Sequence, residues 1–225
     1  QQSRSRISNT TTTIESGMKI KICGMKYPEN SKEIAALQPD YLGFIFYDKS
    51  PRLLENEIPS LEKSIAKVGV FVNATVKEIK EKARQHQLET IQLHGEESPD
   101  FCRSVQLLKL KVIKSFNIDN QFNFKILESY KNYCDYFLFD TKGDQYGGNG
   151  TAFDWQLLKQ YHLDKPYFLS GGIGPESLVD LQIFLQTESA RHCIALDLNS
   201  RFETQPGQKN PETLKTFLKK LKEQL

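Results

Sequence analysis

The sequence predicts one (β/α)8 barrel, a closed ring of eight parallel strands with a helix after each strand. From Met18 onward, short apolar runs rich in Ile, Val and Phe alternate with longer charged stretches of helical pattern. This alternation is typical of βα units and of a parallel sheet. Eight runs and eight stretches fit into 225 residues, close to the lower size limit of about 200 residues for such barrels. No linker rich in Gly, Ser or Pro divides the chain, so we expect a single domain.

Each expected strand is a short apolar run, and each is followed by a longer, charged segment that we expect to be helical. The strands are predicted at Lys19–Cys23, Tyr41–Phe46, Lys67–Asn73, Thr90–His94, Lys111–Phe116, Tyr136–Asp140, Tyr167–Ser170 and His192–Asp197. The helices are predicted near Pro28–Leu37, Glu55–Ser64, Val76–Gln87, Pro99–Leu108, Phe122–Asn132, Phe153–Tyr161, Glu176–Leu185 and Pro211–Leu225.

A doubly wound open sheet is the main alternative, because it is also built from βαβ units. Its dinucleotide-binding form would place a GxGxxG turn after the first strand, whereas this chain has Cys23-Gly24-Met25-Lys26 there. In a barrel, functional groups gather at the carboxyl ends of the strands. The residues expected there are Cys23, the loop from Phe46 to Arg52, Asn73, His94, Ser115 or Phe116, Asp140, Ser170 to Gly172 and Asp197 to Ser200.

The composition excludes several classes of protein. Thirty basic and twenty-eight acidic residues leave a formal net charge of +2, which points to neither nucleic acid nor a membrane surface. No apolar run approaches the about 18 residues needed to span a bilayer. The four cysteines lie far apart, without the spacing that zinc requires, so we expect reduced thiols in a cytosol and no metal.

The first seventeen residues differ from the rest of the chain. They are polar, with Thr10 to Thr13 at their centre, and they lack the apolar stretch of a secretory signal. We therefore expect residues 1–17 to form a disordered N-terminal extension, or to reflect a mis-assigned start with Met18 as the true beginning, and residues 18–225 to form the barrel.

A glycine-rich segment after the seventh expected strand has the character of a phosphate-binding loop. Gly171, Gly172 and Gly174 allow backbone N–H groups to approach an anion, and a helix is expected to open just after them. Loops seven and eight of barrels frequently form one phosphate site between them, which brings in Asn199 and Ser200. The alternative interpretation is a tight turn without a ligand.

Two ionisable side chains end apolar strands. Asp140 follows Tyr-Phe-Leu-Phe, and desolvation at the rim of an apolar barrel would raise its pKa and favour an acid role. Cys23 ends the first strand and could act as a base or a nucleophile. The alternatives are an aspartate that caps a turn and a cysteine that only packs. Cys102, Cys134 and Cys193 lie within helix or strand patterns and are interpreted as filler.

Three further sequence features lie at or near the ends of expected strands. The planar guanidinium of Arg52, in the loop after the second strand, suits a ligand carboxylate, although such an arginine is often only solvated. His94 ends the fourth strand, and we favour a role in lining the site or fixing a loop over a general-base role. The glycines of Gly147–Thr151 suggest either a mobile flap or an irregular turn.

Five short segments at expected strand ends form an ordered set. They are Lys21–Gly24, Ser50–Arg52, Gln92–Gly95, Phe139–Lys142 with Gly150–Trp155, and Leu169–Gly172. Together they resemble the phosphoribosylanthranilate isomerases of tryptophan biosynthesis, and Pro206–Asn210 also follows that family's pattern. The chain departs from the family at Arg201, where a glycine usually follows the serine of the last loop.

The resemblance implies the Amadori rearrangement of N-(5-phosphoribosyl)anthranilate to 1-(2-carboxyphenylamino)-1-deoxyribulose 5-phosphate, by general acid/base catalysis and without a cofactor. It implies that Asp140 is the acid and that Cys23, as a thiolate, is the base. The thiol pKa of about 8.5 can fall toward neutrality beside positive charge, which the iminium of the opened substrate would supply. Arg52 would hold the anthranilate carboxylate, and His94 would line the site. The phosphate would be bound by Gly171, Gly172, Asn199 and Ser200.

Two other functions remain open on the same scaffold. Indole-glycerol-phosphate synthase shares the phosphate site, but its chemistry calls for a lysine and glutamates where this chain has Cys23 and Asp140. A sensor that binds a phosphoribosyl ligand without catalysis would lose the acid or the base, and both are present. We therefore expect a cytoplasmic enzyme, monomeric or homodimeric, whose partner is a small phosphosugar, with no nucleic acid and no membrane.

Overall fold

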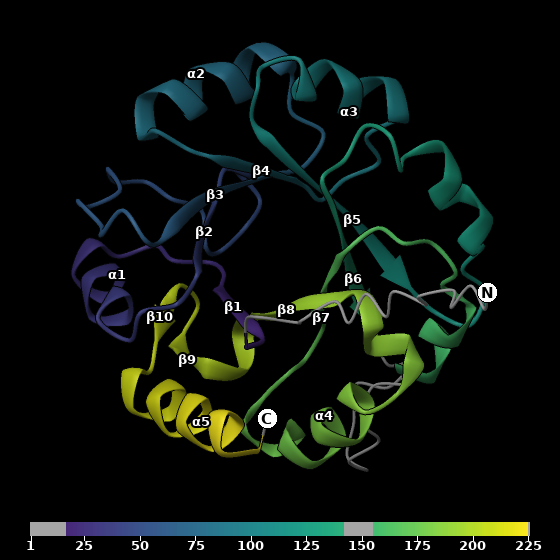
Figure 1. The fold of residues 1–225 in the computed structure, drawn as a ribbon. Helices are drawn as coiled ribbons and strands as arrows, with labels where there is room; N and C mark the ends of the chain where they lie inside the picture. Colours follow the sequence, from purple (N-terminus) through teal and green to yellow (C-terminus); the bar gives the residue numbers. More distant parts are fainter. Residues whose placement is uncertain (1–16, 142–154, 225) are drawn as a thin grey trace, which may run out of the picture.

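The strands of the chain close into one barrel, which confirms the predicted fold class. The computed structural model describes residues 17–141 and 155–224. Each strand pairs in parallel with the next one along the chain, and β8 returns to β1. The strands are β1 (Lys19–Ile22), β2 (Tyr41–Ile45), β3 (Ala66–Phe71), β4 (Thr90–Leu93), β5 (Lys111–Ile118), β6 (Tyr136–Thr141), β7 (Tyr167–Ser170) and β8 (Cys193–Leu198). Figure 1 looks down the barrel axis, with the helices outside the ring.

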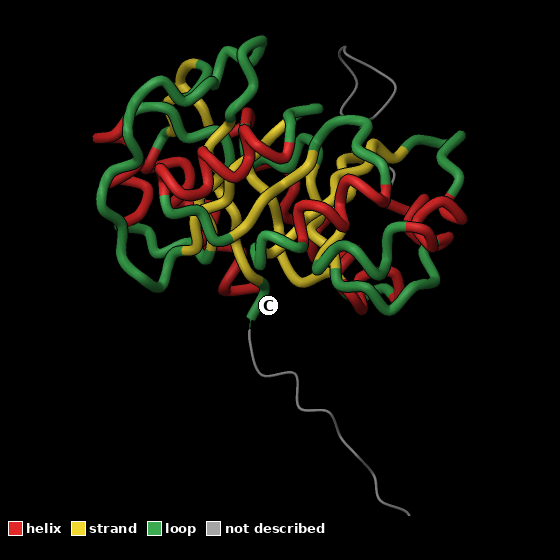
Figure 2. The backbone as a smooth tube through the Cα atoms, turned by 90° about the horizontal axis from the view of Figure 1, so that it is seen from above, coloured by secondary structure: helices red, strands yellow, loops and turns green. Residues whose placement is uncertain are grey.

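The outer layer is less regular than the expected eight helices. Its α-helices are α1 (Pro28–Ala35), α2 (Val76–His86), α3 (Pro99–Gln106), α4 (Leu178–Leu185) and α5 (Pro211–Gln224). Short 3-10 segments complete it at η1 (Phe124–Ser129), η2 (Trp155–Gln160), η3 (Pro175–Ser177), η4 (Glu188–His192) and η5 (Ser200–Phe202). In the side view of Figure 2 the strands lie inside and the helical segments lie around them.

One predicted helix is wrong. The segment Glu55–Ser64 contains no helix, and the chain passes from β2 to β3 in an extended loop. Pro59 explains this, because it lacks an N–H donor and disfavours helical backbone at the residue before it. The expected helices after β5 and β6 are reduced to η1 and η2, and residues 153 and 154 lie outside the described part.

An addition that the sequence did not predict follows β8. The chain forms a small antiparallel ribbon of β9 (Glu203–Gln205) and β10 (Gln208–Lys209) before α5 begins. Figure 1 shows this ribbon beside α1 and α5, next to the end of β1. It therefore stands at the rim where the first and last strands meet.

The barrel interior has an apolar floor and a polar layer above it. Tyr41, Val68, Ile113, Leu138, Phe168 and Ala195 form a buried cluster inside the ring. Because side chains alternate along a strand, the residues two positions later face the same interior, one layer nearer the carboxyl ends. Those residues include Ser115, Asp140, Ser170 and Asp197. A larger apolar core fills the space between the ring and the outer helices.

Candidate active site

Cys23 lies directly after β1, at the carboxyl-end rim of the ring. Its backbone N–H donates to the Leu198 carbonyl at 2.9 Å, which ties it to the end of β8. The thiol is buried against β2, where a Cβ added to Gly43 would lie 2.8 Å from the sulfur. Glycine at position 43 therefore makes the room in which the thiol sits.

A buried ion pair lies beside this thiol. Lys21 Nζ is 2.8 Å from Asp197 Oδ1, and Ser170 donates its hydroxyl to Asp197 Oδ2 at 3.2 Å. Burial alone would lower the pKa of Lys21, but Asp197 and Cys23 outweigh it and the pKa is raised. Lys21 therefore remains a cation at the base of the site.

The charge state of Cys23 in the ligand-free protein is set mainly by burial. Burial raises the pKa of the thiol, and the nearby cations Lys21 and Lys209 only partly oppose this. Asp197 adds to the rise. Cys23 is therefore a protonated thiol at neutral pH in the ligand-free protein.

Asp140 and His94 come together from β6 and from the end of β4. His94 Nε2 lies 3.8 Å from Asp140 Oδ2, and the Gln92 side-chain amide lies 3.0 Å from His94 Nδ1. If this amide donates its N–H, the ring proton is on Nε2 and faces the carboxylate. Burial lowers the pKa of His94, so the imidazole is neutral. The described geometry thus places His94 beside the expected acid.

Arg52 does not stand free in solvent. Its guanidinium forms a side-on ion pair with Glu203 of β9, with Nη2 2.6 Å from Oε2. A Cβ added to Gly24, which has φ +76°, would lie 2.7 Å from Arg52 Cδ and 2.8 Å from Asn199 Oδ1. Arg52 and Asn199 therefore converge on the residue that follows Cys23.

Two glycines of the loop after β7 adopt left-handed backbone conformations. Gly171 and Gly172 have φ of 102° and 65°, which side-chain-bearing residues rarely adopt. Across from it, Ser200 begins η5, and the neighbouring Arg201 forms an ion pair with Glu176 of η3. The two loops of the expected phosphate site are thus joined at their rims by the ion pair between Arg201 and Glu176.

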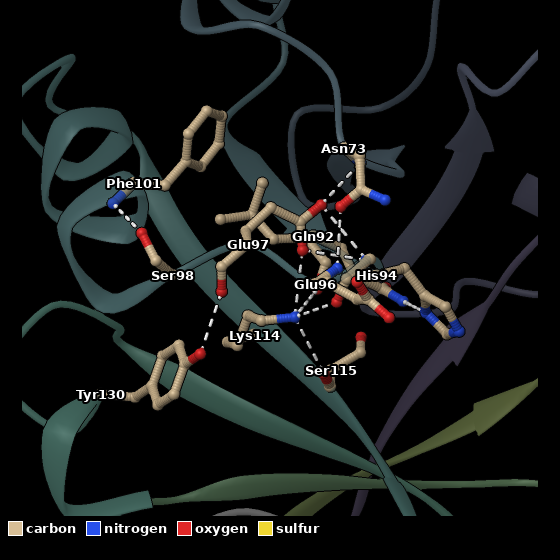
Figure 3. Close-up of polar contacts among 12 residues, drawn as sticks. Asn73, Gln92, His94, Glu96, Glu97, Ser98, Phe101, Lys114, Ser115 and Tyr130 are labelled. Atoms are coloured by element: carbon tan, nitrogen blue, oxygen red, sulfur yellow. Dashed lines mark hydrogen bonds and ion pairs between the residues drawn. The ribbon is translucent and has the colours of Figure 1, made fainter. Parts of the chain in front are cut away.

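A cavity of about 240 Å³ lies beside His94, between the ends of β4 and β5. It is lined by His94, Gly95, Glu96, Lys114, Ser115, Phe116, Asn117, Ile126 and Tyr130. Among the described residues, the buried Ser115 hydroxyl and Gln92 carbonyl oxygen have no hydrogen-bond partner. Figure 3 shows both side chains close to His94. Both polar atoms are buried at the end of the barrel that holds His94.

Comparison with known proteins assigns the family. The sequence model of N-(5'-phosphoribosyl)anthranilate (PRA) isomerase matches residues 20–220. The chain belongs to this family. The isomerase of Parabacteroides distasonis is 42% identical over 210 residues, covering 91% of this chain and 93% of the relative. That of Phocaeicola vulgatus is 40% identical and covers 92% of this chain and all of the relative.

Solved structures agree with the family assignment. The phosphoribosyl anthranilate isomerase of Thermotoga maritima superposes with a TM-score of 0.74 at 33% identity, over 92% of this chain and 100% of that one. A phosphoribosyl anthranilate isomerase in complex with reduced 1-(o-carboxyphenylamino)-1-deoxyribulose 5-phosphate gives a TM-score of 0.72 at 29% identity, with the same coverage. The predicted resemblance to this isomerase family is confirmed, and the open-sheet alternative is excluded by the closed barrel.

Several charged residues of the candidate site were missed by sequence reasoning. Lys21 and Asp197 lie in segments singled out from the sequence, but no role was assigned to them. Alternation along β1 was the available signal, because it puts Lys21 on the same face as Cys23. Glu203 and Lys209 were not predicted, because Glu203 pairs with Arg52, which lies 151 residues before it, and Lys209 pairs in turn with Glu203. The expected flap at Gly147–Thr151 lies outside the described residues.

Proposed function

We propose that this chain isomerises N-(5'-phosphoribosyl)anthranilate to 1-(2-carboxyphenylamino)-1-deoxyribulose 5-phosphate, with Asp140 as the general acid and Cys23 as the general base. Family membership supports the reaction. The observation that supports the assignment of roles is that the Asp140 carboxyl group of β6 and the Cys23 thiol, directly after β1, lie at the same carboxyl-end rim of one closed ring. This reaction needs one acid and one base, and its redox change is internal to the substrate.

In the first step, Asp140 gives a proton to the ribose ring oxygen. The bond from this oxygen to C1 breaks, and the nitrogen lone pair forms a C1=N double bond, which leaves an open-chain iminium ion. His94 Nε2 lies 3.8 Å from Asp140 Oδ2, and its imidazole is neutral. It can therefore hold the carboxyl group in place without forming an ion pair with it. The acid ends this step as a carboxylate.

In the second step, Cys23 takes the proton from C2. The electrons of the C2–H bond form a C1=C2 double bond, and the iminium nitrogen recovers its lone pair. The enol then becomes a ketone as C2 loses the hydroxyl proton and C1 gains one. The pKa of the Cys23 thiol is raised by burial in the free protein, with Lys21 opposing that rise. The cationic iminium adds a second positive charge and favours the thiolate when it is required.

Binding is divided between two ends of the site. We propose that Arg52 holds the anthranilate carboxylate through charge-assisted hydrogen bonds and that His94 lines the site beside it. The phosphate is proposed to lie between the loops after β7 and β8, because glycine lets backbone N–H groups approach an anion closely. Its proposed ligands are Gly171, Gly172, Asn199 and Ser200.

The assembly of the chain is proposed to be a monomer or a homodimer in the cytoplasm. One of the similar structures contains monomers generated from the dimeric isomerase of Thermotoga maritima, which supports both forms for the fold. In the described part of the chain, no helix has the length and apolar character that a bilayer crossing demands.

A fluorescence assay that follows loss of phosphoribosylanthranilate tests the proposed function. We expect turnover by the purified chain and a loss of about 10²- to 10⁴-fold in Cys23→Ala and in Asp140→Asn, because each removes a proton-transfer group. Both variants should still bind the reduced product analogue. The matched controls are Cys193→Ala, another buried thiol, and Asp164→Asn, an exposed carboxylate. Wild-type turnover in either active-site variant would refute the corresponding role.

A further inference from the structure

The guanidinium of Arg52 is held along one of its two edges. Arg52 Nε lies 2.8 Å from Glu203 Oε1, and Nη2 lies 2.6 Å from Glu203 Oε2. This side-on pair occupies the edge of the guanidinium group that Nε and Nη2 form. Arg52 Nη1 makes no hydrogen bond to any residue in the described ranges 17–141 and 155–224. The edge formed by the two terminal nitrogens is therefore left for a ligand carboxylate.

Glu203 is itself fixed from several sides. Its side chain is only 5% exposed, and it accepts a hydrogen bond from Lys209 Nζ at 2.5 Å and one from the Gly207 N–H at 3.1 Å. Burial would raise the pKa of Glu203, but Arg52 and Lys209 outweigh it and lower the pKa. The carboxylate therefore stays ionised and keeps Arg52 in one orientation.

Lys209 anchors this arrangement to the barrel. Its side chain is fully buried and also donates to Asn199 Oδ1 at 2.8 Å, at the end of β8. Its backbone N–H donates to the Asn30 side chain at 2.8 Å, and its carbonyl accepts from the same side chain at 2.9 Å. The ribbon β9–β10 is thus bound to α1 and to the expected phosphate loop at once.

The local charge count also fits a carboxylate ligand. Two cations, Arg52 and Lys209, share the single carboxylate of Glu203, which leaves an excess of one positive charge beside Cys23. Burial lowers the pKa of Lys209, and the Glu203 carboxylate opposes that shift. A partly buried cation in excess favours binding of one anion there, since the anion restores the balance.

We propose that Glu203, supported by Lys209, is a positioning residue that sets the specificity of this enzyme for a substrate with an aromatic carboxylate. It turns the terminal edge of the Arg52 fork toward the ligand and holds it there before binding. The inference rests on the proposed function, because it assigns the substrate carboxylate to Arg52. A role that is only structural would stabilise the fold but would not distinguish between ligands.

The test compares two ligands that differ only in the carboxylate. They are the reduced product analogue, 1-(2-carboxyphenylamino)-1-deoxyribitol 5-phosphate, and the same compound with a phenylamino group in place of the carboxyphenylamino group. The dissociation constants are measured by calorimetry for the wild type, Arg52→Ala, Glu203→Gln and the double variant. The ratio of the two constants reports carboxylate recognition alone.

We expect the wild type to bind the carboxylated ligand about 10- to 100-fold more tightly, which is the gain in affinity expected from charge-assisted hydrogen bonds. Arg52→Ala should abolish this preference, Glu203→Gln should remove most of it, and the double variant should match Arg52→Ala. Affinity for the ligand without the carboxylate should change little. In turnover, Glu203→Gln should raise KM more than it lowers kcat.

Two variants keep the test decisive. Glu55→Gln removes an exposed carboxylate that pairs with Lys26 on the same side of the barrel, and it should leave the ratio unchanged. Glu203→Asp keeps the charge but shortens its reach, so it should lose part of the ratio even if Glu203→Gln folds poorly. If Glu203→Gln weakens binding of both ligands equally, or leaves the ratio of their dissociation constants unchanged, the inference is overturned. The proposed function would still stand in that case, provided that the wild type turns over the substrate. Absence of wild-type turnover would instead refute the proposed function.

Discussion

At the scale of single residues, the charge of Cys23 depends on side chains that lie two positions away or on other strands. Lys21 precedes it by two residues on the same face of β1, and Asp197 stands opposite Lys21 in the register of β8. These partners were not predicted from the strand-end position of Cys23 alone. That position predicts a reactive thiol, but its pKa follows from burial and from the Lys21–Asp197 pair.

We predict that Cys23 reacts with iodoacetamide slowly at neutral pH and faster as the pH rises beyond the ordinary thiol pKa of about 8.5. The sign follows from burial, which raises the pKa of Cys23 and delays formation of the thiolate. Lys21→Met should slow alkylation further at any fixed pH, because the cation that opposes this rise is removed. Mass spectrometry of the modified peptide measures the rate.

The control for this alkylation experiment is Cys23→Ala, which reports any reaction of the three other buried thiols. A rate that levels off at or below pH 8.5 in the free protein would show that the thiol pKa is not raised. A Lys21→Met variant that reacts faster than the wild type would show that the ammonium does not favour the thiolate.

At the scale of elements, the loop after β4 is fixed by one buried carboxylate. Glu97 accepts hydrogen bonds from the backbone N–H groups of Asn73 and Gly95, each at 2.9 Å, and pairs with Lys114 of β5 at 3.0 Å. Figure 3 shows Glu97 between these groups. The ends of β3, β4 and β5 are therefore tied together on the side of the site that holds His94.

We predict that Glu97→Ala lowers the free energy of unfolding by about 3–5 kcal/mol, because it leaves the buried Lys114 ammonium with backbone carbonyl acceptors but without a carboxylate. Glu96→Ala, at the neighbouring exposed position, should change it by less than about 0.5 kcal/mol. Urea unfolding followed by circular dichroism measures both. Similar values for the two variants would mean that the Glu97 contacts do not stabilise the rim.

Helical periodicity in the sequence predicted some elements of the outer layer and failed for others. Helical periodicity predicted α2 and α5 to within one residue at each end. It failed at Glu55–Ser64, where Pro59 interrupts the pattern. The strands β9 and β10 have three and two residues, and Pro206 and Gly207 mark the turn between them. The contacts to Asn30 and Arg52 that hold the ribbon come from distant parts of the chain, so its place could not be predicted.

At the scale of the whole molecule, closure of the barrel brings segments that are distant in the sequence into one site. Strand alternation and the order of motifs were sufficient to predict the closed ring and the strand-end positions of Cys23 and Asp140. They could not predict which ionised groups share a buried partner, because those pairs join β1 with β8 and the loop after β2 with β9. The roles of the predicted site residues stay predictions that substitution must test.

The measurement that tests the central claim most directly uses phosphoribosylanthranilate carrying deuterium at C2 of the ribose. If Cys23 removes this hydrogen, the wild type should show a primary isotope effect in single turnover. Cys23→Ala should remove the deuterium about 10²- to 10⁴-fold more slowly while it still binds the reduced product analogue. Removal of the C2 deuterium by Cys23→Ala at the wild-type rate would contradict the account.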